Sequence, residues 1–262
     1  MIDFFINLNP VIQALIATLF TWFVTLLGAA IVFFFKKINK SFMDGMLGFA
    51  AGIMISASFF SLLSPAIEMA NNLNMIVWIV TSIGFIFGGL LLFIGDKVFD
   101  HIYDKEKENN KRIIMLVLSI TLHNIPEGLA VGVAFGSIAY GLDGATFGSA
   151  CILALGIGLQ NFPEGCAVSF PLRREGMTRK KAFFWGQLSG IVEPVSGIAG
   201  AILVMKVRLI LPFLLSFAAG AMIYVVIQEL IPASQTNKRK DLMALFSLIG
   251  FTIMMILDIS IK

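Results

Sequence analysis

The chain has 262 residues, of which 58% are hydrophobic and 13% charged, with a formal net charge of +3 and a mean hydropathy of +0.92. Soluble domains carry about 25% charged residues, so this composition excludes a soluble globular protein and indicates a membrane protein. The small net charge says little about partners. We expect contact with membrane lipid and no nucleic-acid partner.

Eight apolar runs follow one another, each long enough for a membrane-spanning helix, which needs about 20 residues. The first lacks a preceding positive charge and is too long for a signal peptide, so we predict that it is retained. The expected fold class is an all-α integral membrane protein, with one polytopic domain over residues 1–262. The runs lie at about 9–35, 43–69, 75–95, 113–139, 145–171, 181–203, 208–232 and 241–261.

Basic residues alternate between the two sides of this map. Sixteen of the 19 Lys and Arg residues follow the first, third, fifth and seventh runs. Cytoplasmic loops are enriched in Lys and Arg, so these segments should be cytoplasmic and both termini should lie outside. The densest of them, at 96–112, mixes both charge signs and is predicted to be a cytoplasmic loop. The sequence thus predicts a multi-pass protein of a plasma or bacterial inner membrane.

Two internal repeats accompany this alternation. His-Asn-Ile-Pro-Glu-Gly at 123–128 returns as Gln-Asn-Phe-Pro-Glu-Gly at 160–165, and residues 49–55 return at 217–223. Each repeat relates runs of opposite direction, which predicts inverted repeats of runs 1–3 with 6–8 and of run 4 with run 5. Such repeats are typical of secondary transporters. Chance similarity between apolar helices is the alternative, and it is weaker for the first repeat than for the second.

Apart from those near the ends of the runs, four acids fall inside the runs, where an ionisable group is costly and indicates function. Three of them adjoin a proline, which disrupts the helical hydrogen bonds, and in lipid the freed carbonyls need another partner. A shared polar cavity that binds a cation therefore explains them better than three unrelated kinks. The acids are Glu127, Glu164, Glu193 and Glu229.

The side chains beside these acids indicate the kind of cation. His123 and Glu127 are four residues apart, as are Gln160 and Glu164, so each pair shares one helix face. One imidazole with carboxylates and amide oxygens suits Zn²⁺, Fe²⁺, Mn²⁺ or Cd²⁺, whereas Ca²⁺ and Mg²⁺ prefer oxygen alone. Because neighbouring carboxylates repel without a cation, an empty site should take up protons, and transport should depend on pH.

Two other classes of function stay open on these residues. An intramembrane metalloenzyme would use a bound metal to activate water, but the usual two-histidine pattern with an adjacent base is absent, and we expect no enzyme. A metal-gated channel or receptor is the second alternative. The two cysteines, Cys151 and Cys166, stand about 22 Å apart along one predicted helix, which excludes a disulfide between them and favours packing roles.

Four motifs together resemble the ZIP family of divalent-metal transporters, especially its prokaryotic GufA-like branch. They are the two Pro-Glu-Gly hexapeptides, Gly-Gln-Leu-Ser-Gly at 186–190 leading to Glu193-Pro194, and Glu-Leu-Ile-Pro at 229–232. The resemblance covers nearly the whole chain. It implies import of a divalent metal, with zinc as the foremost cargo, by a homodimer in which runs 1, 4, 5 and 6 move like an elevator against runs 2, 3, 7 and 8.

The resemblance also implies a pair of adjacent metal sites bridged by Glu164. The first would use Met54, His123, Glu127, Gln160 and Glu164, and the second Asn124, Asn161, Glu164 and Glu193. Many members have histidine at the position of Gln160, so the first site should be weaker or less zinc-selective here. Members with two bound metals often have an acid at the position of Asn161, so the second site should be less fully occupied here.

The family pattern further implies an outer access route along the second run. Ser61 and Glu68 follow Met54 at seven-residue steps, roughly two helical turns each. Glu68 would either attract cations at the rim or be merely solvated. Glu229 would line the path or stabilise the scaffold, and Asp258 is expected near the outer interface in a structural or solvated role.

Overall fold

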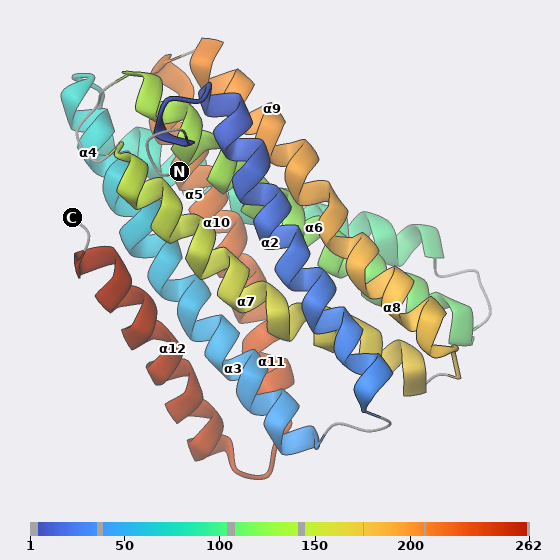
Figure 1. The fold of residues 1–262 in the computed structure, drawn as a ribbon. Helices are drawn as coiled ribbons and strands as arrows, with labels where there is room; N and C mark the ends of the chain where they lie inside the picture. The colour runs from blue at the N-terminus through green and yellow to red at the C-terminus, as the bar shows by residue number, and fades with distance from the viewer. Residues whose placement is uncertain are drawn as a thin grey trace.

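The computed structural model describes residues 5–35, 39–103, 108–140, 145–174, 176–206 and 208–260. Within these ranges, only the backbone is described for residues 99–103, 108–120, 122, 123, 140, 174, 206 and 208. Every regular element among the described residues is helical, and the helices form one elongated bundle (Figure 1).

The helices follow the predicted runs closely. Three of them change helix type partway, through the short segments η1, η3 and η5. The order is α2 (Pro10–Phe34), α3 (Lys40–Ala57), η1 (Ser58–Leu63), α4 (Ser64–Asn72), α5 (Val77–Tyr103), α6 (Glu108–Ser137), η2 (Ile138–Tyr140), α7 (Phe147–Arg174), α8 (Arg179–Leu188), η3 (Ser189–Ile191), α9 (Val192–Lys206), η4 (Arg208–Ile210), α10 (Leu211–Val225), η5 (Val226–Leu230), α11 (Ile231–Ser234) and α12 (Lys240–Ser260).

Seven helices of the described part are long and apolar enough to cross a membrane, and the 30-residue α6 lies among them in the bundle (Figure 1). The outer faces of α5 and α12 carry exposed apolar side chains, such as Trp78 at 72% and Leu248 at 62%. Apolar faces of this extent are unfavourable in water, so the surface suits the interior of a bilayer. This confirms the prediction of a helical, multi-pass membrane protein.

The segment at 96–112 differs from its prediction as a loop. Helix α5 extends to Tyr103 and α6 begins at Glu108, so most of the segment is helical. Lys97 shows how a helix continues past its apolar part: its Nζ lies 5.8 Å from the centre of the Phe93 ring, one turn earlier. The long side chain thereby covers apolar surface while its charge stays at the helix end.

Local sequence signals set several helix starts. Asn9 accepts a hydrogen bond from the Val11 N–H and is followed by Pro10 at the first helical position. Asn39 caps α3 in the same way through the Ser41 N–H, and Thr178 caps α8 through the Lys181 N–H. These caps satisfy backbone donors that a helix leaves unpaired at its start.

The most extensive helix pairs are α2 with α7, α6 with α9, α5 with α10, and α3 with α12. Glycines bring two of these pairs into backbone contact. A Cβ atom on Gly52 of α3 would collide with the Ser247 carbonyl oxygen of α12, and one on Gly220 of α10 would collide with the Phe85 carbonyl oxygen of α5. Only glycine fits at either position.

Helices α3 and α10 share a further irregularity. Each passes into a π-helical segment that ends two residues before a proline, η1 in the first case and η5 in the second. The segments begin at Ser58 and Val226, which are separated by the same offset as Gly52 and Gly220. Figure 1 shows the two helices running in opposite directions through the middle of the bundle.

Candidate metal centre

The two hexapeptides lie on α6 and α7, with Pro126 and Pro163 inside the helices. Their polar side chains point into the protein. Those of Asn124, Glu127, Gln160 and Asn161 are 0% exposed, and that of Glu164 is 6% exposed. Because burial of polar groups in an apolar bundle is unfavourable without partners, the contacts of these side chains define the candidate site.

Glu127 and Gln160 join the two hexapeptides directly. The Gln160 Nε2 donates to Glu127 Oε1 at 2.6 Å. The pair therefore links α6 to α7 through an amide donor and a carboxylate acceptor, as expected if both residues belong to one site.

Glu193 forms a second polar group with Asn161. The Asn161 Nδ2 lies 2.9 Å from Glu193 Oε1 and 3.0 Å from Oε2, and it is 3.3 Å from the Thr21 carbonyl oxygen. The Thr21 hydroxyl also donates to Glu193 Oε2. Glu193 lies in the first turn of α9, directly before Pro194.

Thr21 is a site residue that the sequence analysis missed. It carries no charge and adjoins no proline, so it had neither of the two features that marked the other site residues, an ionisable group or a disrupted helix. A signal did exist: Thr18, Thr21 and Thr25 recur at helical spacing in an otherwise apolar run, and all three are buried. This spacing places their hydroxyl groups on one face of α2.

Four buried oxygen atoms of the site have no hydrogen-bond partner among the described residues. Buried polar atoms are rarely left unsatisfied, and such a group indicates an ion, a water or a ligand. Carboxylate and amide oxygens suit divalent cations of the borderline and hard classes. The four atoms are Asn124 Oδ1, Glu127 Oε2, Gln160 Oε1 and Asn161 Oδ1.

Glu164 occupies the electrostatic centre of the group. Its carboxylate is close enough to repel those of Glu127, Glu193 and Glu229. Negative charges that gather in a low dielectric without a cation are strongly unfavourable. A divalent ion beside Glu164 would relieve all of these repulsions together.

The described part of the structure gives no side-chain contact with the site for two other predicted ligands, Met54 and His123. Met54 is fully buried on α3, which packs against α7, while the side chain of His123 lies outside the described residues. Where side chains are described, no three His, Cys, Asp or Glu side chains lie close enough together to hold a metal ion. The amide oxygens of Gln160 and Asn161 belong to the candidate ligand set because they are buried and have no hydrogen-bond partner among the described residues.

The predicted access residues divide into two groups. Ser61 is buried in η1 and its hydroxyl donates to Asp258 Oδ1 at 2.6 Å. Asp258 itself is 2% exposed, so the structural alternative fits it and the solvated one does not. Glu68 is exposed and Glu229 is half-buried. A cavity of only 20 Å³ lies beside Ser61, between α4 and the facing ends of α6 and α7.

The fold and this centre together define a class of protein. It is a multi-pass helical membrane protein with a cluster of buried oxygen atoms between its helices that could bind an ion. Comparison with known proteins identifies the family. The family model described as ZIP zinc transporter matches residues 105–258.

Curated relatives match over nearly the whole chain. Zinc transporter ZIP11 of Xenopus tropicalis is 38% identical over 331 aligned residues, which cover 97% of this chain and 98% of the relative. Zinc transporter ZIP11 of Homo sapiens is 36% identical, with the same coverage. Zinc transporter GufA of Myxococcus xanthus is 32% identical over 94% of this chain and 98% of its own. The chain therefore belongs to the ZIP family, as its motifs predicted, and the relatives are named as transporters, not enzymes.

Proposed function

We propose that this protein imports divalent transition metals, zinc foremost and iron, manganese and cadmium next, into the cytoplasm. Membership of the ZIP family supports metal transport across a membrane. The observation that carries the proposal is the set of unpartnered oxygens of Asn124, Glu127, Gln160 and Asn161 at the junction of α6, α7 and α9. These groups are buried among helices, where a cargo ion is the simplest partner for them.

Within this proposal the metal is held by two adjacent sites that share Glu164. Met54, His123, Glu127 and Gln160 complete the first, and Asn124, Asn161 and Glu193 complete the second. The central position of the Glu164 carboxylate among the other acids supports its bridging role.

The transport mechanism that we propose is an elevator-like motion of two blocks. The first block contains α2, α6, α7, α8 and α9, and the second contains α3, α4, α5, α10, α11 and α12. All four of the most extensive helix pairs lie within a block, not between blocks. The weaker packing between α3 and α7 and between α6 and α10 is consistent with sliding at that boundary.

An inverted repeat underlies these blocks in our proposal, with the first three spans matching the last three. The repeat exchanges the α2–α7 pair with the α9–α6 pair, and the α5–α10 pair with the α12–α3 pair. All four pairs are present, and the glycine contacts and π-helical segments recur at one offset. The basic segments are assigned to the cytoplasm, which puts both termini outside.

The outer access route is closed in this arrangement. The 20 Å³ cavity beside Ser61 has room for about one water molecule. Its lining comes from both proposed blocks, so their separation would open a path from outside to the metal centre. We propose that the functional unit is a homodimer in which the second block is the fixed part.

Uptake by purified protein in proteoliposomes tests the proposal. Labelled zinc should accumulate with saturation, and unlabelled iron, manganese or cadmium should compete. Glu164→Ala should reduce uptake most among the site variants, to near background, because it removes the shared carboxylate. An intact, folded protein that moves none of these metals would contradict the proposed activity, and normal uptake by Glu164→Ala would contradict the site. Flux that does not saturate would favour a channel.

A further inference from the structure

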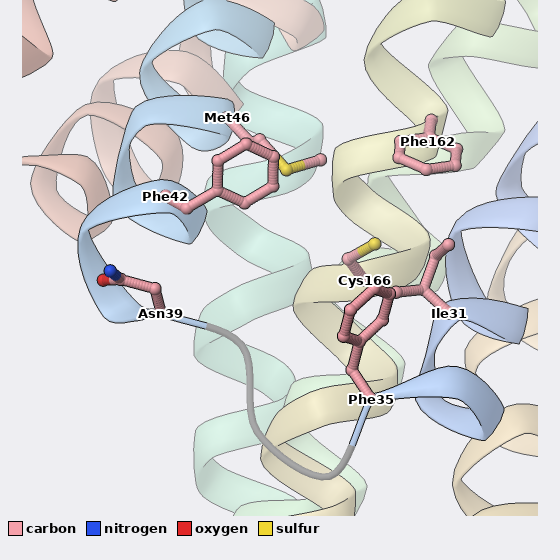
Figure 2. A pocket seen from close by; sticks show the side chains of 7 residues that line it. All are labelled: Ile31, Phe35, Asn39, Phe42, Met46, Phe162 and Cys166. Carbon is pink, nitrogen blue, oxygen red and sulfur yellow. The ribbon is translucent and has the colours of Figure 1, made fainter.

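A cavity of 360 Å³ separates α3 from α2 and α7, on the side of the bundle where α2 ends and α3 begins (Figure 2). Its volume falls within the range of small-molecule sites, about 300–1,000 Å³. In Figure 2, Phe42 and Met46 reach from α3 towards Phe162 on α7. The lining residues are Ile31, Phe35, Asn39, Phe42, Met46, Phe162 and Cys166.

The chemistry of this lining does not suit the metal cargo. The described residues of the lining include no carboxylate and no imidazole. The Cys166 thiol donates to the Gly28 carbonyl oxygen at 3.1 Å, and the Asn39 side chain accepts from the Ser41 N–H as a helix cap. With its polar groups already engaged, the cavity would stabilise apolar matter and not an ion.

Two basic residues stand close to residues that line the cavity. Lys40 is exposed and follows Asn39 in the chain. The Arg179 Nη1 donates to the Phe33 carbonyl oxygen at 3.3 Å, two residues before Phe35. Phe35 and Phe42 are themselves 54% and 62% exposed. An apolar cavity with basic residues close to its lining is complementary to an amphiphile with an apolar tail and an anionic head.

We propose that this cavity binds an acyl chain of an anionic phospholipid from the cytoplasmic leaflet, with its head group held by Lys40 and Arg179. A peptide suits the cavity poorly, because its backbone donors and acceptors would find almost no free partner there. A lipid chain has no such groups, and the bilayer supplies it at high local concentration.

The bound lipid would regulate transport, which is the part of the inference that rests on the proposed function. The cavity joins α2 and α7 of the first block to α3 of the second. Phe162 and Cys166 also lie two residues to either side of Glu164 on α7. A chain seated here contacts both blocks at the depth of the metal centre, so it holds them in the present arrangement until it leaves.

Quenching of tryptophan fluorescence by brominated lipids tests the binding without any transport. The background is a variant in which the three native tryptophans, Trp22, Trp78 and Trp185, are replaced by phenylalanine. Phe42→Trp then places a single reporter in the lining. Phe87→Trp is the control, because Phe87 is similarly exposed, at 56%, but lies on α5 away from the cavity.

In mixed nanodiscs, the Phe42→Trp reporter should be quenched more by brominated phosphatidylglycerol than by brominated phosphatidylcholine. The Phe87→Trp reporter should be quenched equally by both lipids, because it faces the bulk bilayer. Equal quenching of the Phe42→Trp reporter by the two lipids overturns the proposal.

The two basic side chains should account for the preference. Lys40→Gln and Arg179→Gln, each in the Phe42→Trp background, should each lower the preference for phosphatidylglycerol about fivefold, the effect of one basic residue near an anionic surface. A preference that survives the double substitution overturns the assignment of the head-group site.

Zinc uptake as a function of lipid composition tests the regulation separately. Met46→Trp fills the cavity from α3, and its uptake should no longer respond to the phosphatidylglycerol fraction, while that of the wild type should. Selective quenching in a protein that moves no metal would support the lipid site and contradict the proposed function. Zinc uptake by a protein without selective quenching would support the proposed function and contradict the lipid site.

Discussion

The amides of Gln160 and Asn161 stand next to each other on α7 and donate to different carboxylates, Glu127 and Glu193. Each amide thus supplies a partial positive charge where a cation would otherwise lie, while its own oxygen has no hydrogen-bond partner among the described residues. The arrangement fits a site in which amide N–H groups contact the carboxylates when no cargo is bound, and a metal ion contacts them when it is bound. Metal binding should require both amides to release these carboxylates, so that the carboxylates and the unpartnered amide oxygens can contact the ion.

Gln160→His tests the role of the first amide. An imidazole is a stronger zinc ligand than an amide oxygen, and the change also removes the donor that occupies Glu127. We expect half-maximal uptake at a several-fold lower zinc concentration, with a smaller change for manganese. Competition uptake in proteoliposomes measures both. Gln160→Leu is the control and should weaken uptake of every metal; a matching gain there would contradict a ligand role.

Thr21→Val tests the contact that the sequence analysis missed. The substitution keeps the shape of the side chain and removes the hydroxyl that donates to Glu193. A hydrogen bond to a charged group contributes about 1.5–3 kcal/mol, so we expect a lower melting temperature and weaker zinc uptake, with Thr21→Ser close to wild type. Thr252→Val on the exposed face of α12 is the matched control. If both valine variants behave alike, the contact with Glu193 is not stabilising.

Much of the residue-level site followed from chemistry that the sequence displays. Carboxylates and amides beside prolines in apolar runs indicated burial and a shared cavity, and the Glu127–Gln160 and Asn161–Glu193 contacts agree with that. The partnership of Ser61 with Asp258 and that of Thr21 with Glu193 were not predictable, because each joins helices far apart in the chain. No local pattern encodes which hydroxyl will face which acid.

At the scale of elements, the sequence predicts where helices lie better than where they end. Hydropathy marks the part of a helix that lies in lipid, and the predicted runs match the helices on that basis. Helix α5 continues beyond its run to Tyr103, and Lys97 packs back on Phe93 in this extension. The π-helical segments were not predicted either, although each ends two residues before a proline.

The close helix contacts make a prediction about stability. Gly52→Ala should separate α3 from α12, because its methyl group would collide with the Ser247 backbone. Overpacking typically costs about 1–3 kcal/mol, and backbone atoms have little room to move. We expect a clear drop in melting temperature in detergent, and the same for Gly220→Ala.

Gly89→Ala is the matched control for both substitutions. It introduces the same methyl group on α5, where the nearest atoms would lie at ordinary contact distances of 3.7 and 3.8 Å. It should leave the melting temperature nearly unchanged. Equal losses in all three variants would mean that the close backbone contact does not determine the result.

At the scale of the whole molecule, the two proposed blocks can be locked together. Met69 and Ser149 line the small outer cavity from α4 and α7, which belong to different blocks. With Cys151 and Cys166 replaced by alanine, the pair Met69→Cys and Ser149→Cys can be joined by a short, cleavable thiol reagent. Uptake should stop on cross-linking and return after cleavage, and each single-cysteine variant should keep its uptake. Full uptake by the linked protein would contradict motion between the blocks.

The pairing of helices also has a consequence for biogenesis. None of the four principal pairs joins consecutive spans, so the earlier helix of each pair enters the bilayer well before its partner. The interval between insertion and pairing is longest for α3, because its partner α12 is the last helix of the described chain. Until α12 inserts, the glycine-lined face of α3 is open to lipid or to other chains. A chain that stops before Lys240 should therefore insert but not mature, and it should be a substrate for membrane quality control.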